Sequence, residues 1–451
     1  MLSPLPQTPS LSRTKPAFDA PSLAEAGLAT SASDASMTTL QEAREEALAS
    51  YLFALVGIGY LFPFSALTQP VDYWKMLFPD YNIEFALTSA FMYTNLGFLA
   101  LIVVLLGKPW YTGRIVGGFL GQLIVLAFIP TSYFFLASES ANAVAVLGGT
   151  AVVAIATAFI DSSTIALVSQ YPLRVQESFQ LGVGLSSLIG SFYRDLTKLV
   201  FPVDELVAST LIYFYTGALT IALCILAYFK VMSLRITKKY VTVDNDVEMT
   251  ETSHLLKANT SLQKTPLVDG SYSSDDEGKA APTKWSVLRK VYHLQILITL
   301  VFVCTLSLWP PLVTEIKTYN FPSLQASGWW SLILLTIFSI WDCVGRFMVR
   351  HRFGLTPQNI WIVVLARFLL IPVIVGIVKG YWLTSDWWSL LFVSILGHTN
   401  GYVGTLTIIF VNESVHQDEQ QLAGPFTSFF LNLGLVLGAS AGLVMEKLVL
   451  G

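Results

Sequence analysis

Ionisable side chains within three long apolar stretches of the sequence are the residues whose chemistry needs explaining. Asp342 and Arg346 are four residues apart, Asp161 lies in the segment AFIDSST, and Arg194 is followed directly by Asp195. Residues four apart share a helix face and can form an ion pair, whereas sequence neighbours point to different faces. The spacing therefore predicts an ion pair between Asp342 and Arg346, which either holds helices together or binds a solute. For Arg194 and Asp195 we expect a structural role near a helix end, from which long side chains reach the interface.

Asp161 differs from the other ionisable residues because no basic residue lies one helical turn away from it. Placing a charge in hydrocarbon costs at least about 2.5–3.5 kcal/mol, so such residues are tolerated where they pair or line a water-filled path. An isolated carboxyl group near the middle of an apolar stretch therefore favours a functional role for Asp161 over a structural one.

Two further segments combine helix-disrupting residues with aromatic side chains. They are GIGYLFPFS at residues 57–65 and LWPP at residues 308–311. Unwound backbone is allowed at membrane depth where it lines a cavity, and interruptions at corresponding positions of two halves indicate a solute site near the midplane. We therefore expect a helix break in each segment. Phe64 and Trp309 would either stack on a flat ligand or pack in the protein interior.

The composition places these residues in a membrane protein. Of 451 residues, 54% are hydrophobic and only 12% are charged, against about a quarter charged in a typical soluble domain. This excludes a soluble enzyme, because a water-facing surface needs more charge. A net charge of −4 offers no basic surface for nucleic acid. The three cysteines have no metal-site or disulfide spacing, so we expect no metal and no cofactor.

The apolar stretches are long enough to cross a membrane as helices, which takes about 20 residues. They are too long and too continuous for the strands of a β-barrel, so we predict an all-α membrane protein of eleven helices in a 6+5 arrangement. The predicted spans are residues 47–69, 85–106, 114–137, 143–170, 178–201, 206–232, 291–314, 327–349, 359–378, 387–411 and 424–447.

Polar sequence divides the chain into four parts. We expect a disordered cytosolic tail over residues 1–45, a six-helix bundle over 46–232, a largely disordered cytosolic loop over 233–290 and a five-helix bundle over 291–451. Lys and Arg residues gather in the tail, the long loop and alternate short loops. By the positive-inside rule, this predicts a cytosolic N-terminus and an extracellular or lumenal C-terminus.

Several spans carry motifs that resemble those of the equilibrative nucleoside transporter family. The motifs are GIG through PF at residues 57–64, FSIWDCVGR at 338–346, ARFLLIP at 366–372, TNGY at 399–402, and AG at 423–424 with FFLNLGLVLG at 429–438. The resemblance covers essentially every predicted span, in order. It implies a fold similar to the major facilitator superfamily, with a nucleoside-sized site between two halves and alternating access.

The resemblance also implies roles for individual residues. Asp342 and Arg346 would contact the ribose hydroxyls or the base, which suits a carboxylate acceptor and a forked guanidinium donor. The other implied solute-binding residues are Phe64 and Ser65, which stand where the family usually has Trp and Asn, together with Trp309, Ser339 and Asp161.

Three residues of this sequence raise questions that the resemblance leaves open. Arg114 matches a family arginine of the cytosolic gate, and Glu419 is its nearest acidic candidate partner, with Gln421 as the alternative residue at the family's acidic position. Asp161 occupies the position where many members have Gln. Burial favours the neutral form of a carboxyl group, so Asp161 is a candidate for carrying a proton. Proton coupling, an altered base preference and affinity for cationic amines are the three alternatives for this position.

We therefore expect transport of nucleosides or nucleobases across a lipid bilayer, either facilitative or proton-coupled. The alternatives are a polyspecific carrier of organic cations such as monoamines and a membrane scaffold or receptor with a vestigial cavity. In the long loop, Glu251, Leu255 and Leu256 fit an acidic dileucine sorting signal, unless the pattern arises by chance. Such a signal would bind an adaptor and would direct the protein to an endolysosomal or vacuolar membrane instead of the plasma membrane.

Overall fold

The structure is a computed structural model that describes residues 23–79, 83–105, 110–201, 205–241, 283–381 and 383–450. Every regular element in these ranges is a helix. In chain order the helices are α1 (Leu23–Thr68), α2 (Val71–Leu77), α3 (Ile83–Leu105), α4 (Tyr111–Ser132), α5 (Glu139–Val168), α6 (Leu173–Val200), α7 (Leu206–Met232), α8 (Arg235–Val241), α10 (Lys284–Leu308), α11 (Pro322–Ala326), α12 (Trp329–Met348), α13 (Ile360–Ala366), η2 (Arg367–Leu369), α14 (Leu370–Lys379), α15 (Asp386–Glu413) and α16 (Gln417–Leu450).

The chain divides into two units, Met1–Glu46 and Ala47–Gly451. The described part of the first unit is the beginning of α1. The second unit contains the rest of α1 and all the other helices, and it holds every residue of the candidate site.

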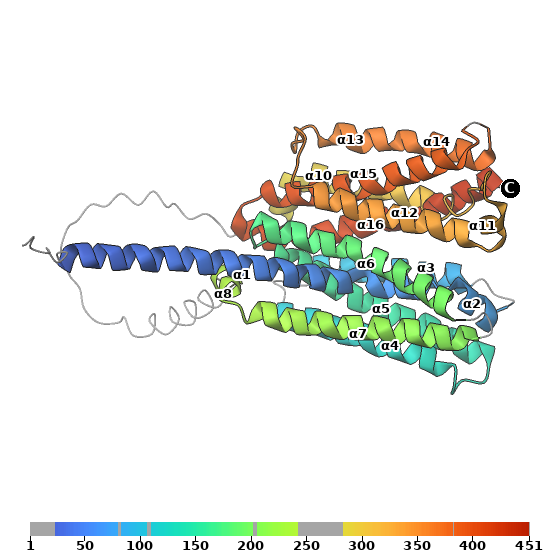
Figure 1. The fold of residues 1–451 in the computed structure, drawn as a ribbon, viewed down its shortest axis with the longest axis horizontal. Helices are drawn as coiled ribbons and strands as arrows, with labels where there is room; N and C mark the ends of the chain where they lie inside the picture. Colours follow the sequence, from blue (N-terminus) through green and yellow to red (C-terminus); the bar gives the residue numbers. More distant parts are fainter. Residues whose placement is uncertain are drawn as a thin grey trace, which may run out of the picture. The chain divides into compact units, whose positions relative to one another are not determined.

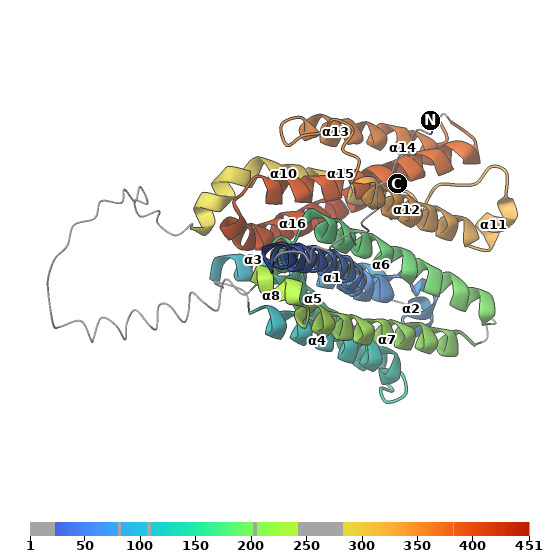
Figure 2. The same cartoon turned by 60° about the vertical axis from the view of Figure 1, so that its left-hand side comes forward.

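Two helical bundles make up the second unit (Figure 1). In one bundle α5 packs against α3 and α4, and α4 packs against α7; in the other, α10 packs against α16 and α12 against α15. The bundles meet where α6 contacts α12 and where α3 and α5 contact α16. In both views α13 and α14 lie at the outer edge of the second bundle, away from this interface (Figures 1 and 2).

Nine helical segments among the described residues are long and apolar enough to cross a membrane. The two remaining long helices, α6 and α15, coincide with predicted spans but carry more polar residues. An all-α fold with membrane-spanning helices is therefore confirmed. The crossing of α6 and α15, and with it the count of eleven, stays a prediction.

The first predicted helix break is wrong, because α1 remains helical through Pro63. The glycines before this proline allow close packing instead. A Cβ atom at Gly57 would overlap the carbonyl oxygen of Phe179 on α6, and one at Gly59 would lie 2.8 Å from the Sγ of Cys224 on α7. Neighbouring helices that pack this closely support a helix across a proline. The second predicted break is present, since α10 ends directly before the LWPP prolines.

The described helices also extend into sequence that the composition assigns to polar segments. Helix α1 begins at Leu23, within the predicted tail, while α8 and the first turn of α10 lie within the predicted loop over 233–290. In the second unit, α2, α11 and the end of α16 lie at one end of the bundles, and α8 and the beginning of α10 lie at the other (Figure 1). The sorting pattern at Glu251, Leu255 and Leu256 lies outside the described residues.

Candidate functional site

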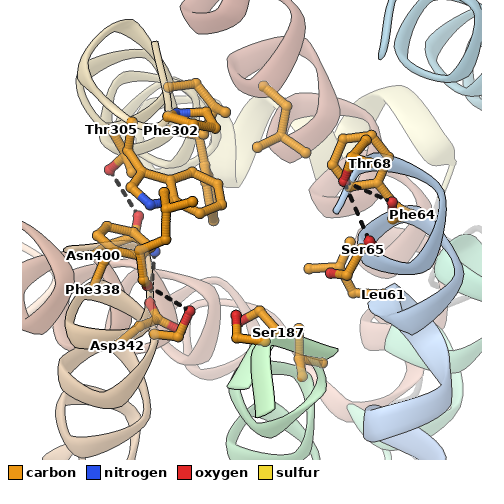
Figure 3. Close-up of a pocket in the computed structure, with 18 of the residues that line it drawn as sticks. Leu61, Phe64, Ser65, Thr68, Ser187, Phe302, Thr305, Phe338, Asp342 and Asn400 are labelled. Atoms are coloured by element: carbon orange, nitrogen blue, oxygen red, sulfur yellow. Dashed lines mark hydrogen bonds between the residues drawn. The ribbon is translucent and has the colours of Figure 1, made fainter. Parts of the chain in front are cut away.

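A cavity of about 430 Å³ lies between the two bundles. Helices α1, α3, α5 and α6 line it from one bundle, and α10, α12, α15 and α16 line it from the other. Figure 3 shows Leu61, Phe64 and Ser65 of α1 facing Phe338 and Asp342 of α12 across open space. The volume of this cavity falls within the range of about 300–1,000 Å³ that is typical of small-molecule sites.

Asp342 and Arg346 lie side by side in the wall of this cavity. The Nε of Arg346 donates a hydrogen bond of 2.8 Å to Oδ2 of Asp342, which confirms that the two residues form an ion pair. Both are buried, with 3% and 8% of their surfaces exposed. Gly184 on α6 makes room for the guanidinium, since a Cβ atom there would lie 2.5 Å from the Cδ of Arg346. The ion pair is therefore desolvated at the boundary between the bundles.

The second oxygen of Asp342 is held by Asn400 of α15, whose Nδ2 donates a hydrogen bond of 2.7 Å to Oδ1. This contact requires α12 and α15 to lie close together. A Cβ atom at Gly401 would overlap the carbonyl oxygen of Asp342, and one at Gly397 would overlap that of Phe338. Sequence reasoning missed the role of Asn400. The signal that could have indicated it is an amide in an apolar stretch, flanked by glycines four residues apart.

Aromatic side chains form two walls of the cavity. Phe64 of α1 lies against Phe91 of α3 with ring centroids 4.6 Å apart. Trp309 stacks on Phe338 with centroids 4.7 Å apart and ring planes 18° apart. Both predicted aromatic residues therefore line the cavity and pack against a second ring.

The predicted residues Ser65 and Ser339 also line the cavity, whereas Asp161 does not. Asp161 is completely buried, and its Oδ2 accepts a hydrogen bond of 2.7 Å from Nδ2 of Asn432. Asn432 lines the cavity, and its Oδ1 accepts a hydrogen bond of 2.8 Å from Nδ2 of Asn95. Asp161 is therefore connected to the cavity through a neighbouring amide.

The two predicted gating residues are not brought together. Glu419 is buried and forms its ion pair with Lys290 of α10. Arg114 is half-buried in the first turn of α4, beside Tyr111, and no ion pair joins it to Glu419 among the residues that the structure describes. The predicted gate pair is therefore absent among the described residues of this structure.

Side-chain amides join the two bundles beyond the Asp342 end of the cavity. Nδ2 of Asn412 on α15 donates to Oε1 of Gln176 on α6 at 2.9 Å. Nε2 of Gln421 on α16 donates to Oε1 of Gln170, which follows α5, at 3.1 Å. We call these four residues the amide layer. The sequence indicates only Gln421 of these four as a gate position, because Gln and Asn give no charge pattern to follow.

Arg346 also joins the bundles. Its Nη1 donates to the carbonyl oxygen of Gln180 at 3.3 Å and to the Oε1 of the same residue at 3.2 Å. The residue that the sequence identifies as a solute contact is therefore also a bridge between α12 and α6.

Arg194 and Asp195 line the cavity towards the end that carries α2 and α11. Arg194 forms an ion pair with Asp72 of α2, and Asp195 accepts a hydrogen bond of 3.2 Å from Oγ1 of Thr336 on α12. The three described cysteines are buried free thiols. Within the described ranges, no group of three His, Cys, Asp or Glu side chains is arranged to hold a metal ion.

Comparison with known proteins agrees with this architecture. A family model described as nucleoside transporter matches residues 147–447, which is more than half of the chain. The chain belongs to the nucleoside transporter family. It is 25% identical over 394 residues to equilibrative nucleotide transporter 8 of Arabidopsis thaliana, covering 86% of this chain and 92% of that protein. It is 24% identical over 436 residues to equilibrative nucleoside transporter 4 of Homo sapiens, covering 86% of this chain and 81% of that protein.

Solved structures of major facilitator superfamily proteins share the fold of this nucleoside transporter family member. The proton:xylose symporter XylE bound to 6-bromo-6-deoxy-D-glucose aligns with a TM-score of 0.61 and 10% identity, over 90% of each chain. The transporter FucP in the outward conformation aligns with a TM-score of 0.53 and 14% identity, over 89% of this chain and 91% of that one. The family and the fold identify a multi-pass membrane transporter of nucleosides and not an enzyme.

Proposed function

We propose that the cavity binds neutral nucleosides, with the ribose hydroxyls at Asp342 and Arg346, and that alternating access carries them across the membrane. The buried ion pair in the cavity wall is the observation that carries this proposal. Each oxygen of the Asp342 carboxylate accepts one hydrogen bond within the protein, from Arg346 or from Asn400. A carboxylate oxygen has two lone pairs, so each oxygen retains one for a solute hydroxyl. Two adjacent acceptors suit the vicinal diol of ribose.

The aromatic walls suit the base. A nucleobase is flat and apolar on its faces, and aromatic rings stack on such surfaces at centroid distances of about 4.5–7 Å. Phe64 and Trp309 are the two predicted aromatics on opposite bundles, and each is braced by a second ring.

The charges in the cavity favour a neutral solute over a nucleotide or a cation. The charged residues that line it are Arg194, Asp195, Asp342 and Arg346, two of each sign. A phosphate group would add about −1.5 to −2 charges without a matching excess of basic side chains. An organic cation would need a carboxylate in the wall without a neighbouring cation. Asp342 pairs with Arg346, Asp195 lies near Arg194 and Lys198, and Asp161 lies outside the wall. This distribution supports a nucleoside or nucleobase and argues against the polyspecific cation carrier.

Alternating access requires cross-bundle contacts that break without great cost. The amide layer meets this requirement, because a neutral hydrogen bond contributes only about 0.5–1.5 kcal/mol. The bridge from Arg346 to Gln180 must also break when the bundles separate at that end. We therefore assign gating to the amide layer together with this bridge.

Proton coupling through Asp161 is a second proposal, favoured by its surroundings. Asn432 and Ser428 on α16 and Tyr60 on α1 are the polar groups that face the Asp161 carboxyl group. Of these, Tyr60 is the titratable one, and among the described residues no Lys or Arg pairs with Asp161. Burial without a cationic partner favours a protonated carboxyl group. Asn432 would connect proton binding at Asp161 to solute binding in the cavity.

Uptake into proteoliposomes tests these proposals. We expect labelled adenosine and uridine to enter down their gradients, and AMP and a monoamine to be excluded. Monoamine uptake driven by membrane potential would instead identify a cation carrier, and no uptake of any of the four would identify a scaffold. Repeating the adenosine measurement with an acidic exterior tests proton coupling, which requires faster uptake into the liposomes under that gradient.

The membrane and the orientation are part of the proposal. We infer a cytosolic N-terminus and an extracellular or lumenal C-terminus from the distribution of Lys and Arg. The dileucine pattern at Glu251, Leu255 and Leu256 favours an endolysosomal or vacuolar membrane reached through an adaptor, with the plasma membrane as the alternative. Replacing Leu255 and Leu256 with Ala and imaging the tagged protein tests this, since redistribution to the cell surface supports the signal.

A further inference from the structure

Arg367 is a buried cation to which the proposed transport cycle assigns no role. It lies in η2, outside the cavity lining, with 3% of its surface exposed. Its guanidinium donates to the carbonyl oxygen of Val301 at 2.9 Å, to Oγ1 of Thr305 at 2.6 Å and to Oγ1 of Thr399 at 3.1 Å. All three acceptors are neutral, and no carboxylate forms an ion pair with it in the part of the chain that the structure describes. A buried charge without a counter-charge is destabilising, so its presence needs a reason.

A line of hydrogen bonds connects Arg367 to Asp342. Oγ1 of Thr305 accepts from Arg367 and donates to Oδ1 of Asn400 at 2.8 Å. Nδ2 of Asn400 then donates to Oδ1 of Asp342 at 2.7 Å. Figure 3 shows the last three members, Thr305, Asn400 and Asp342, following one another along one wall of the cavity.

The chemistry at the two ends sets the direction of these bonds. A guanidinium has donors only, so Thr305 must accept from Arg367. The single proton of Thr305 can go to Oδ1 of Asn400 at 2.8 Å or to the carbonyl oxygen of Val301 at 3.1 Å, and we assign it to the nearer acceptor, Asn400. An ionised carboxylate has acceptors only, so Asn400 must turn its amino group towards Asp342. Every donor along this line therefore points from the cation towards the anion.

We propose that Arg367 is a positioning residue for solute binding. Through Thr305 and Asn400 it holds Oδ1 of the Asp342 carboxylate in place, so that the carboxylate is oriented to accept hydrogen bonds from the vicinal hydroxyls of a ribonucleoside. The inference rests on the proposed function, because it assumes that Asp342 binds the ribose. It assigns substrate discrimination to a residue that does not touch the substrate.

Kinetics of adenosine and 2′,3′-dideoxyadenosine uptake in proteoliposomes test the proposal. Dideoxyadenosine lacks the two vicinal hydroxyls, at C2′ and C3′, that the proposal places at Asp342, so we expect its KM not to depend on how Asp342 is held. In Arg367→Gln we expect the KM for adenosine to rise about tenfold, equivalent to about 1.4 kcal/mol. The KM for dideoxyadenosine and the maximal rates should match the wild type. If Arg367→Gln does not fold, Thr305→Val takes its place, because it interrupts the same line of hydrogen bonds at the next residue. It should give the same selective rise in the KM for adenosine.

Thr399→Val is the matched control, because it removes a hydrogen bond from the same guanidinium without interrupting the path to Asp342. It should transport both substrates as the wild type does. Three outcomes would assign Arg367 a structural role and overturn the inference. The first is an equal KM change for the two substrates, and the second is an effect of Thr399→Val on adenosine alone. The third is failure of both Arg367→Gln and Thr305→Val to fold. A wild type that does not distinguish adenosine from dideoxyadenosine would overturn the proposed function, and the inference with it.

Discussion

The buried pair of Asp342 and Arg346 shows why a membrane protein keeps charges in its interior. Such a pair gains little net stability, because desolvation offsets the attraction between the partners. Both residues line the cavity and both have capacity for further hydrogen bonds, so the pair serves binding more than folding.

Replacing either Asp342 or Arg346 with Ala should lower adenosine uptake by about tenfold or more, since a hydrogen bond to a charged group contributes about 1.5–3 kcal/mol. Uptake is measured per amount of folded protein in proteoliposomes. Glu413→Gln is the control, because its pair with Arg352 is about one-third exposed and exposed pairs contribute little. Near-normal KM for adenosine in either alanine variant would disprove the site assignment.

Asp161→Asn separates the proton hypothesis from a purely structural role. The amide keeps an oxygen that can accept from Asn432 but cannot bind a proton at ordinary pH. We expect downhill adenosine exchange to continue, while the acceleration by an acidic exterior disappears. Uptake is compared over a range of external pH in both proteins. If adenosine uptake by the wild type does not change with external pH, the proton hypothesis is wrong.

At the scale of helices, glycines decide which polar side chains can meet. The close approach of α12 and α15 at Gly401 is what allows Asn400 to reach Asp342. Gly404, one turn further along α15, has ordinary space, because a Cβ atom there would lie 3.6 Å from Cγ1 of Val301. These two positions offer a matched comparison on one helix.

Gly401→Ala should lower the melting temperature and raise the KM for adenosine, whereas Gly404→Ala should change neither. The added methyl group at the first position forces the helices apart, and overpacking of this kind costs about 1–3 kcal/mol. Thermal unfolding in detergent and uptake kinetics check the two effects. Equal behaviour of the two variants would show that the spacing of α12 and α15 does not control the site.

The sequence predicts helices and buried charges better than contacts between helices. Apolar length and spacing led to the all-α fold and to the pair of Asp342 and Arg346, because both depend on neighbours along the chain. Helix continuity at Pro63 could not be predicted, since it depends on how α6 and α7 pack against α1. The amide layer escaped prediction for the same reason, as its bonds join helices that are far apart in sequence.

At the scale of the whole molecule, orientation in the membrane decides which end of the cavity faces the cytosol. Ser327 follows α11 and Ser286 lies in the first turn of α10, and both are exposed at opposite ends of the second unit. In a background without the three native cysteines, and with the protein at the cell surface, Ser327→Cys should react with an impermeant thiol reagent added outside intact cells. Ser286→Cys should react only after permeabilisation. The reverse pattern would invert the orientation.

The bridge between Arg346 and Gln180 has a consequence for the empty carrier. When the bundles separate at the Asp342 end of the cavity, Arg346 loses its hydrogen bonds to Gln180. A bound nucleoside can then accept hydrogen bonds from the guanidinium, whereas an empty site cannot. Reorientation should therefore be slower without cargo. We expect preloading of proteoliposomes with unlabelled adenosine to accelerate entry of the labelled compound, and Gln180→Ala to reduce this stimulation. A single arginine would thereby make the protein a better exchanger than a one-way carrier.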